Sequence, residues 1–316
     1  MKASVIVITY NHERFIRQAL DSVLAQQTSF DFEVIVSEDC STDTTREIVI
    51  DYARRYPERI RTIFSESNVH SPWVVERAVR EARGEYINLI DGDDYWTSPY
   101  KLQKQVEFMN SHPEFTLTWH ACVYVDAEGN LCAQQPVPVT HAVWSLQEML
   151  VQYPMETSAV MMRRELIADL PQWYRNGPAG DFALWAMCMQ HGPAGYFDEC
   201  LSAYRIHSES LGMKGRDEIG ALAFWLRTYR DLYLHSPVEC RNMMTRHLAK
   251  LWLAIALRQQ WAGEAAASRM TAREALRDCP TDPKLLVLAY APWLWKPARL
   301  FFRLLGGGVN VPQSEG

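Results

Sequence analysis

The sequence predicts an α/β fold in which a mostly parallel sheet carries helices on both faces, followed by an α-helical C-terminal region. Short β-branched apolar runs alternate with amphipathic segments of helical period over residues 5–109. The run at residues 85–90 is apolar enough to be buried on both faces, as strands of parallel sheets are. From residue 217 to about 275 the chain is rich in Leu, Ala and Arg, with Pro237 as its one proline. Such strict alternation indicates parallel strands joined by right-handed crossovers.

The pattern divides the first part of the chain into four strands and four helices. Strands are expected at residues 5–8, 32–36, 60–64 and 85–90, and helices at 15–24, 42–56, 71–83 and 98–109. The first helix places its apolar residues on one face, namely Phe15, Ile16, Ala19, Leu20, Val23 and Leu24. Ser-Pro pairs at 71–72 and 98–99 suit the N-cap and first turn of the last two helices. Pro57 lies just past the end of the second helix.

The second part of the chain is more mixed. Residues 117–125 alternate as a strand does, and residues 126–130 form a polar turn around Gly129. We expect a loop at 131–143, a strand at 158–163, a short helix at 181–190 and an extended segment at 196–206. A domain boundary is expected near residues 212–215, which separates a domain of residues 1–215 from a helical region of residues 216–316.

Composition and charge exclude several classes of protein. Of the 316 residues, 48% are apolar and 22% charged, which excludes a disordered chain, a collagen-like chain and a coiled-coil rod. The 32 basic and 38 acidic residues give a net charge of −6, so we expect no nucleic acid partner. Seven cysteines without a CxxC pair indicate a reducing, cytoplasmic compartment. Neither a signal peptide nor an apolar run of about 18 residues is apparent, so no transmembrane helix is expected.

Three polar clusters directly follow predicted strands. They are Thr9-Tyr10-Asn11, Glu38-Asp39 and Asp91-Gly92-Asp93-Asp94. Ligands of open parallel sheets bind outside the carboxyl ends of the strands. The topology alone therefore predicts that these clusters line one edge of the sheet.

The acidic cluster at residues 91–94 is the strongest local indication of chemistry. Three carboxylates within four residues repel one another unless a cation neutralises them. Hard oxygen ligands suit Mg²⁺ or Mn²⁺, and Mg²⁺ usually completes its shell with substrate phosphates and water. The alternative is a solvated acidic turn, but the position directly after a buried strand favours the metal.

Three segments in this order resemble the donor-binding half of the family 2 glycosyltransferases, which are inverting enzymes with a GT-A fold. They are SVIVITYNHERFIRQALDSVLAQ, FEVIVSEDCSTDTT and ARGEYINLIDGDDYWTSPYKLQKQ, and together they cover residues 3–110. A weaker resemblance extends through TSAVMMRREL, GDFALWAMCMQHG and LSAYRIHSES to about residue 211. The resemblance implies a donor-nucleotide half at residues 1–110 and an acceptor half at residues 111–215.

The resemblance also implies a role for individual residues. Thr9, Tyr10 and Asn11 would hold the nucleotide base and ribose, Asp39 would contact the base, and Arg77 is a loose match for a donor phosphate contact. Asp91-Gly92-Asp93 matches the DXD motif, in which Asp93 binds the metal, Asp91 lies near the ribose or metal, and Asp94 assists. Asp181 matches the catalytic base, and His207, in a YRxH element, would close over the diphosphate or metal.

Each of these assignments has a structural alternative. Asn11 and Asp39 could be turn residues, because Asn and Asp favour such positions. Arg77 could be a solvated helix residue, Asp181 only a helix cap, and His207 a structural histidine.

The activity implied by the resemblance is the Mn²⁺- or Mg²⁺-dependent transfer of a sugar, with inversion, from a nucleotide sugar such as a UDP-sugar. The acceptor would be a hydroxyl of a glycan or a lipid-linked molecule, in bacterial surface polysaccharide synthesis. The alternative from another class is a non-catalytic nucleotide-sugar-binding or scaffold protein of the same fold. A nucleotidyltransferase should have a glycine-rich loop after the first strand, where this chain reads TYNHERF. An aspartyl-phosphate phosphatase should have its acidic motif after the first strand and not the fourth.

Residues 284–306 are rich in apolar residues and tryptophan, with Lys284, Lys296, Arg299 and Arg303 interspersed. Pro292 and Pro297 exclude one long spanning helix. The segment is either a helix packed on the body or an interfacial segment that places the protein on the inner face of the plasma membrane.

Overall fold

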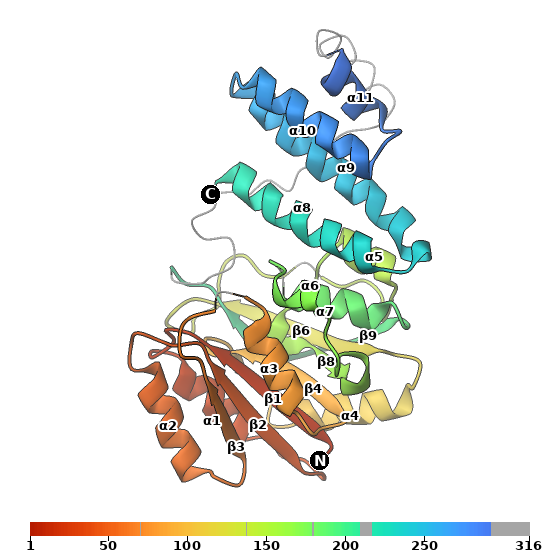
Figure 1. Ribbon diagram of the computed structural model, residues 1–316. Helices are drawn as coiled ribbons and strands as arrows, with labels where there is room; N and C mark the ends of the chain where they lie inside the picture. The colour runs from red at the N-terminus through yellow and green to blue at the C-terminus, as the bar shows by residue number, and fades with distance from the viewer. Residues whose placement is uncertain (70, 137, 179, 209–216, 292–316) are drawn as a thin grey trace. The chain divides into compact units, whose positions relative to one another are not determined.

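The β-branched runs form the centre of a nine-stranded sheet, and the computed structural model describes residues 1–291 except 70, 137, 179 and 209–216 (Figure 1). Strands β1 (Ala3–Thr9), β2 (Phe32–Glu38), β3 (Ile60–Phe64) and β4 (Tyr86–Asp91) are parallel neighbours. Val5 and Val34 on one face of the sheet and Ile6 and Ile35 on the other are completely buried, so both faces are covered here. The predicted parallel sheet is therefore the core of the fold.

The remaining strands extend this sheet from β4. They are β8 (Met161–Arg163), β6 (Leu117–Val125), β9 (Ala194–Arg205) and β5 (Tyr95–Trp96), with β7 (Val143–Trp144) also paired to β9. β8 is antiparallel to both β4 and β6, and β6 is parallel to β9. The strand expected at residues 158–163 begins only at Met161, because Thr157–Ala159 forms the 3₁₀ turn η1.

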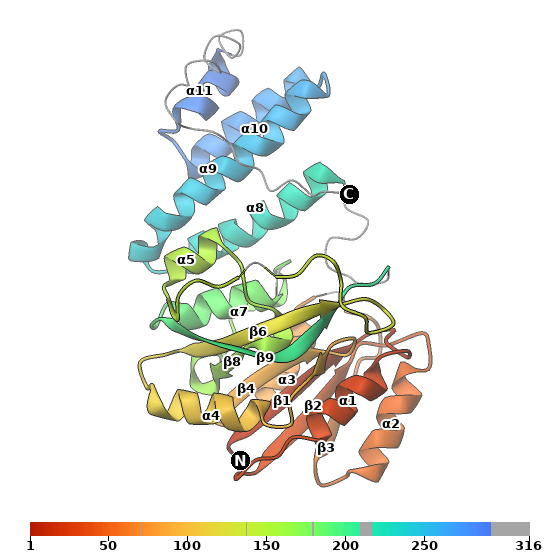
Figure 2. The same cartoon turned by 180° about the vertical axis from the view of Figure 1, so that it is seen from behind.

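Helices cover both faces of the sheet. Their bounds are α1 (Ile16–Leu24), α2 (Thr45–Arg55), α3 (Trp73–Glu81), α4 (Lys101–Ser111), α5 (Leu146–Val151), α6 (Gln172–Arg175) and α7 (Gly180–Met189), with a second 3₁₀ turn, η2, at Arg164–Leu166. Figures 1 and 2 show α1 and α4 on one face, and α3, α6 and α7 on the other. The strong amphipathic patterns of α1 and α3 bury residues such as Leu20 and Ala78 against the strands.

The chain divides into two compact units, Met1–Ser210 and Leu211–Gly316. The second unit contains α8 (Glu218–His235), α9 (Val238–Trp261), α10 (Ala265–Asp278) and α11 (Pro283–Tyr290). Pro237 separates α8 from α9, and Gly263, with a φ of +84°, lies between α9 and α10. The division of the first unit into halves at residue 110 stays a prediction.

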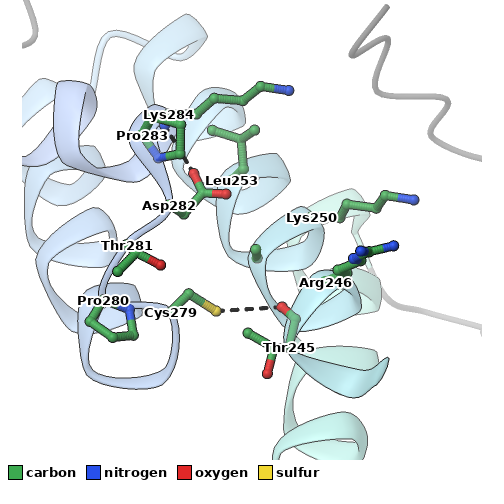
Figure 3. Close-up of a pocket in the computed structure, with 11 residues that line it drawn as sticks. Thr245, Arg246, Lys250, Leu253, Cys279, Pro280, Thr281, Asp282, Pro283 and Lys284 are labelled. Carbon is green, nitrogen blue, oxygen red and sulfur yellow. Dashed lines mark hydrogen bonds between the residues drawn. The ribbon is translucent and has the colours of Figure 1, made fainter. Parts of the chain in front are cut away.

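Two features of the helical unit concern its surface. α9 and the segment that leads into α11 enclose a groove of about 420 Å³, with Arg246 and Lys250 on α9 and Asp282 and Lys284 on the other wall (Figure 3).

Most of the expected interfacial segment, residues 292–306, lies outside the described residues. In the part that is described, Leu285 and Leu288 of α11 are buried. No helix among the described residues is long and apolar enough to cross a membrane.

Candidate active site

The parallel strands bring the three predicted polar clusters to one edge of the sheet. Thr9 pairs with Glu38 across β1 and β2, and Ile8 pairs with Asp91 across β1 and β4. A Cβ atom at Gly92 would lie 2.6 Å from Thr9 Oγ1 and 2.8 Å from His12 Nδ1. Only glycine therefore allows the loop after β4 to lie directly on the loop after β1.

Asp93 lies between two histidines. Its Oδ2 is 3.0 Å from His207 Nε2 and 3.6 Å from His12 Nε2. Burial raises the pKa of Asp93, but the hydrogen bond with His207 and the charge of His12 outweigh this effect and lower the pKa. The structure thus brings the predicted pair Asp93 and His207 together and adds His12.

Asp94 faces the interior of the protein. Its side chain accepts a hydrogen bond at Oδ1 from the Arg205 amide, at 2.9 Å, and its Oδ2 is buried without a hydrogen-bond partner among the described residues. Burial, together with the charges of Asp93 and Asp91, raises the pKa of Asp94 well above its usual range. The Arg205 guanidinium donates to the Asp93 carbonyl at 2.9 Å and to Gln18 Oε1 at 2.7 Å. Arg205 therefore holds the acidic loop in place.

Asp181 and Asp91 are joined through Thr157. The Thr157 hydroxyl donates to Asp181 Oδ2 at 3.2 Å, and it lies close enough to the Asp91 carboxyl to oppose the rise in the pKa of Asp91. Burial raises the pKa of Asp91 well above its usual range, and the charges of Asp93, Asp181 and Glu156 add to this effect. Residues that are 90 positions apart in the sequence thus meet through one threonine side chain.

Asp181 lies in the first turn of α7, with three hydrogen bonds to its carboxylate. Its Oδ1 accepts from the Phe182 amide at 2.7 Å, and its Oδ2 accepts from Tyr153 Oη at 2.8 Å in addition to Thr157. The carboxylate is therefore both a local capping group and part of the acidic cluster.

The residues predicted to hold the nucleotide are bonded to neighbouring loops. Asp39 accepts from Ser65 Oγ at 2.7 Å and from the Val69 amide at 3.2 Å. Asn11, with a φ of +55°, accepts at Oδ1 from the Thr42 amide at 2.8 Å. Thr9 is fully buried and Tyr10 half-buried at the end of β1. These bonds fix the turns after β1 and β2, and they leave the nucleotide contacts as predictions.

Arg77 lies beside β2 and Asp39. Its Nε donates to Ser37 Oγ at 2.9 Å, and its Nη2 donates to the Glu38 carbonyl at 3.1 Å. Burial lowers the pKa of Arg77, and the charges of Asp39 and Glu38 oppose that shift. The guanidinium is thus placed at the β2 end of the edge, next to the predicted base contact.

The donor set at the acidic loop suits a hard divalent cation. Asp91 and Asp93 would supply carboxylate oxygens and His207 an imidazole nitrogen, and the Oδ2 of Asp94 has no hydrogen-bond partner among the described residues. Among the described residues, no three His, Cys, Asp or Glu side chains are already grouped as a metal site. A cation here would complete its shell with oxygens of a ligand.

Sequence reasoning missed several residues of this cluster. His12, Tyr124, Tyr153 and Glu156 are brought in by loops and by β6, and no local motif marks them. For Thr157, with Ser158, the sequence left two interpretations open, namely a residue lining the acceptor site and the start of a strand. Only the three-dimensional arrangement brings them to the acidic cluster.

A known protein family matches about half of the chain. The sequence profile described as Glycosyl transferase family 2 matches residues 4–165. An uncharacterized protein of Mycobacterium tuberculosis is 34% identical over 212 residues, which are 66% of this chain and 60% of that relative. This chain therefore spans less than two thirds of the mycobacterial relative's length. A Bacillus subtilis protein named as a teichuronic acid biosynthesis glycosyltransferase, TuaG, is 29% identical over 66% of this chain and 80% of its own length.

Solved structures share the fold. Staphylococcus aureus TarS, residues 1–349 in complex with UDP-GlcNAc, has a TM-score of 0.66 at 19% identity, over 95% of this chain and 88% of that one. The mannosyltransferase PcManGT of Pyrobaculum calidifontis, in complex with GDP-Man and Mn²⁺, has a TM-score of 0.57 at 20% identity, over 97% of this chain and 84% of that one. The predicted GT-A fold is thereby confirmed.

Proposed function

The chain belongs to glycosyl transferase family 2, and on that premise we propose that it transfers a sugar, with inversion, from a nucleotide sugar to an acceptor hydroxyl. One observation carries the proposal. Thr157 links Asp91, the first acid of the DXD motif, to Asp181, the candidate base. Under this proposal, charge neutralisation would fall to the Asp91 side of this small cluster and proton removal to the Asp181 side.

The diphosphate leaving group requires positive charge. Asp93 and Asp91 would hold Mn²⁺ or Mg²⁺, with His207 beside them and Asp94 next to them in the same loop. The bound ion would neutralise the negative charge that develops on the diphosphate. Arg205 holds the loop that presents Asp93, so these carboxylates are positioned before a ligand arrives.

Asp181 is the proposed general base. It accepts the proton of the acceptor hydroxyl as the hydroxyl oxygen forms its bond to the anomeric carbon. The bond from that carbon to the diphosphate oxygen breaks in the same step, so the nucleoside diphosphate leaves and the configuration inverts. Tyr153 and Thr157 hold the Asp181 carboxylate in a fixed orientation for this transfer.

The proposed donor is a UDP-sugar. UDP-GlcNAc, the ligand of the TarS structure, supports this choice, and GDP-Man, the ligand of PcManGT, makes a GDP-sugar the second donor to test. Thr9, Tyr10, Asn11 and Asp39 would contact the base and ribose at the ends of β1 and β2. Arg77 would contribute a positive charge at that end.

The proposed acceptor is a hydroxyl of a bacterial surface glycan or its lipid-linked precursor. The names of TuaG and of TarS, a poly(ribitol-phosphate) β-N-acetylglucosaminyltransferase, support that class. We place the protein in the cytoplasm, with residues 284–306 as a peripheral contact to the inner face of the plasma membrane.

A donor panel tests this proposal. UDP-GlcNAc, UDP-glucose, UDP-galactose and GDP-mannose are incubated with the protein and simple glycoside acceptors, in Mn²⁺, in Mg²⁺ and in EDTA. We expect one donor to release nucleoside diphosphate in the presence of a divalent ion and none to do so in EDTA. A protein that binds a donor but never turns it over, with any acceptor, would be a non-catalytic binding module. Equal turnover in EDTA would contradict the metal requirement.

A further inference from the structure

Glu156 lies beside the proposed reaction centre without a role in it so far. It directly precedes η1 and is half-buried. The hydroxyl of Tyr124, on β6, donates to Glu156 Oε1. The ring of Tyr124 lies 5.4 Å from that of Tyr204, on β9, so three separate segments meet at this carboxyl group.

Glu156 interacts electrostatically with the acids of the DXD loop and with Asp181. It contributes to the raised pKa of Asp91 and of Asp94, after the larger effects of burial and of Asp93. Burial raises the pKa of Glu156 itself; the Tyr124 hydrogen bond opposes this shift, and the charge of Asp181 adds to it. Glu156 is therefore near both the acids proposed for the diphosphate side and the proposed base.

Among the described residues, no cation pairs with this carboxyl group. None of the ion pairs among the described residues includes Glu156, and its neighbours are acids and tyrosines. An uncompensated carboxylate in such surroundings is costly unless a ligand supplies hydrogen-bond donors. The site thus has acceptor capacity that the described protein groups do not fill.

Tyrosines around Glu156 define the kind of ligand. Tyr124 and Tyr204 flank the carboxyl group, and Tyr153, with 38% of its surface exposed, donates to Asp181 nearby. Aromatic faces with neutral hydroxyls and one carboxylate match a polyhydroxylated ring, which offers apolar C–H faces and hydroxyl donors. A phosphate fits poorly, because the one described charge that acts on Glu156, that of Asp181, is negative.

We propose that Glu156 is a specificity-determining residue that accepts hydrogen bonds from hydroxyl groups of the sugar being transferred. The proposal rests on the function proposed above, which places that sugar between the metal-binding acids and Asp181. Tyr124 is the positioning residue that orients the carboxylate.

The test compares binding of a nucleotide with binding of its sugar conjugate. UDP, UDP-GlcNAc, UDP-glucose and UDP-galactose are titrated calorimetrically, in Mn²⁺, into the wild type and Glu156→Gln. Glutamine keeps the size of the side chain and can still accept from Tyr124. Glu165→Gln, at an exposed position in η2, is the matched control. Thermal unfolding of each variant confirms that it is folded.

We expect Glu156→Gln to weaken the best-bound UDP-sugar about tenfold, as loss of a charged hydrogen-bond acceptor does, and to narrow the differences among the three sugars. Binding of UDP should change less than twofold, and the control should match the wild type. Equal weakening of UDP and UDP-sugar would show that Glu156 acts through the metal or diphosphate and would overturn the proposal. Unchanged binding of all ligands would overturn it too. A wild type that binds no nucleotide at all would instead refute the proposed function.

Discussion

Asp93 and Asp94 are adjacent acids with different surroundings. The Asp93 side chain is 13% exposed and faces His207 and His12. Asp94 is 1% exposed and accepts a hydrogen bond from the Arg205 amide of β9. The sequence assigned both residues to the metal site, but the structure gives Asp94 a second task, which is to join the acidic loop to the sheet.

Exchanging these two acids one at a time separates the tasks. Asp94→Ala should lower the free energy of unfolding by about 1–3 kcal/mol, because it leaves the buried Arg205 amide without its acceptor. Asp93→Asn should leave stability nearly unchanged, because it relieves repulsion among the acids, but it should remove Mn²⁺-dependent nucleotide binding. Urea unfolding and calorimetric titration measure the two effects. If both variants lost the same stability, Asp93 would be a structural residue as well.

Tyr153 is a positioning residue for the candidate base. Tyr153→Phe removes the hydroxyl that donates to Asp181 Oδ2, so the carboxylate loses one of its three fixed bonds. We expect kcat to fall about tenfold, the effect of one hydrogen bond to a charged group, with nucleotide affinity unchanged. Tyr100→Phe, at an exposed tyrosine before α4, is the control and should behave as the wild type. If Tyr153→Phe had the same kcat as the wild type, Tyr153 would not be a positioning residue for Asp181.

At the scale of elements, the sequence predicted regular strands better than short or irregular segments. The parallel strands could be predicted because each is a run of buried β-branched residues long enough to be recognised without tertiary information. Helix α5 was missed within a segment of mixed composition, although Ser145 and Glu148 form a capping box at its start. β5 and β7 have two residues each and exist only through their pairing with β9. Such elements depend on tertiary contacts and leave no local pattern.

Lys101, the first residue of α4, is a charged side chain inside the fold. It is completely buried and its Nζ has no hydrogen-bond partner among the described residues, although the ring of Trp96 lies 4.1 Å away. Burial lowers the pKa of Lys101 well below its usual range. The unfolded chain therefore binds more protons than the folded chain between that lowered pKa and the ordinary value of about 10.4. Wild-type stability gains with rising pH across that window.

Replacing this lysine should stabilise the protein. Lys101→Met keeps a similar length without a polar atom, and we expect a gain of about 1–3 kcal/mol at pH 7 that shrinks toward pH 10. Lys104→Met, at a side chain that is 41% exposed, should change stability little at either pH. Urea unfolding at the two pH values provides the measurement. A destabilised Lys101→Met would mean that Trp96 or an internal water compensates the ammonium group.

At the scale of the whole molecule, every predicted site residue belongs to the first unit. The sequence predicted the edge where they gather, because the carboxyl ends of parallel strands share one edge. It could not predict that Thr157 joins Asp91 to Asp181, since that contact depends on how η1 and α7 pack. The family resemblance supplied Asp181, and the structure supplied its surroundings.

The proposed membrane contact can be tested on the whole chain. Leu285 and Leu288 are buried in the helical unit, so a truncation after Ala291 keeps these two residues and removes the rest of the proposed segment. Lys296, Arg299 and Arg303 should each contribute roughly 1 kcal/mol at an anionic surface, a contribution that salt weakens. We expect the full chain to co-sediment with anionic liposomes at low salt and a chain truncated after Ala291 to stay in solution. A full chain that remains in the supernatant at low salt would contradict the membrane contact.

The most direct test of the central claim is to measure donor binding and turnover side by side in Asp181→Asn. The account makes Asp181 a base that acts on the acceptor, so the variant should bind the nucleotide sugar as the wild type does. Its kcat should fall by roughly two to four orders of magnitude, the usual contribution of general base catalysis. Weakened donor binding with an unchanged kcat would make Asp181 a structural cap of α7 and would contradict the proposed mechanism.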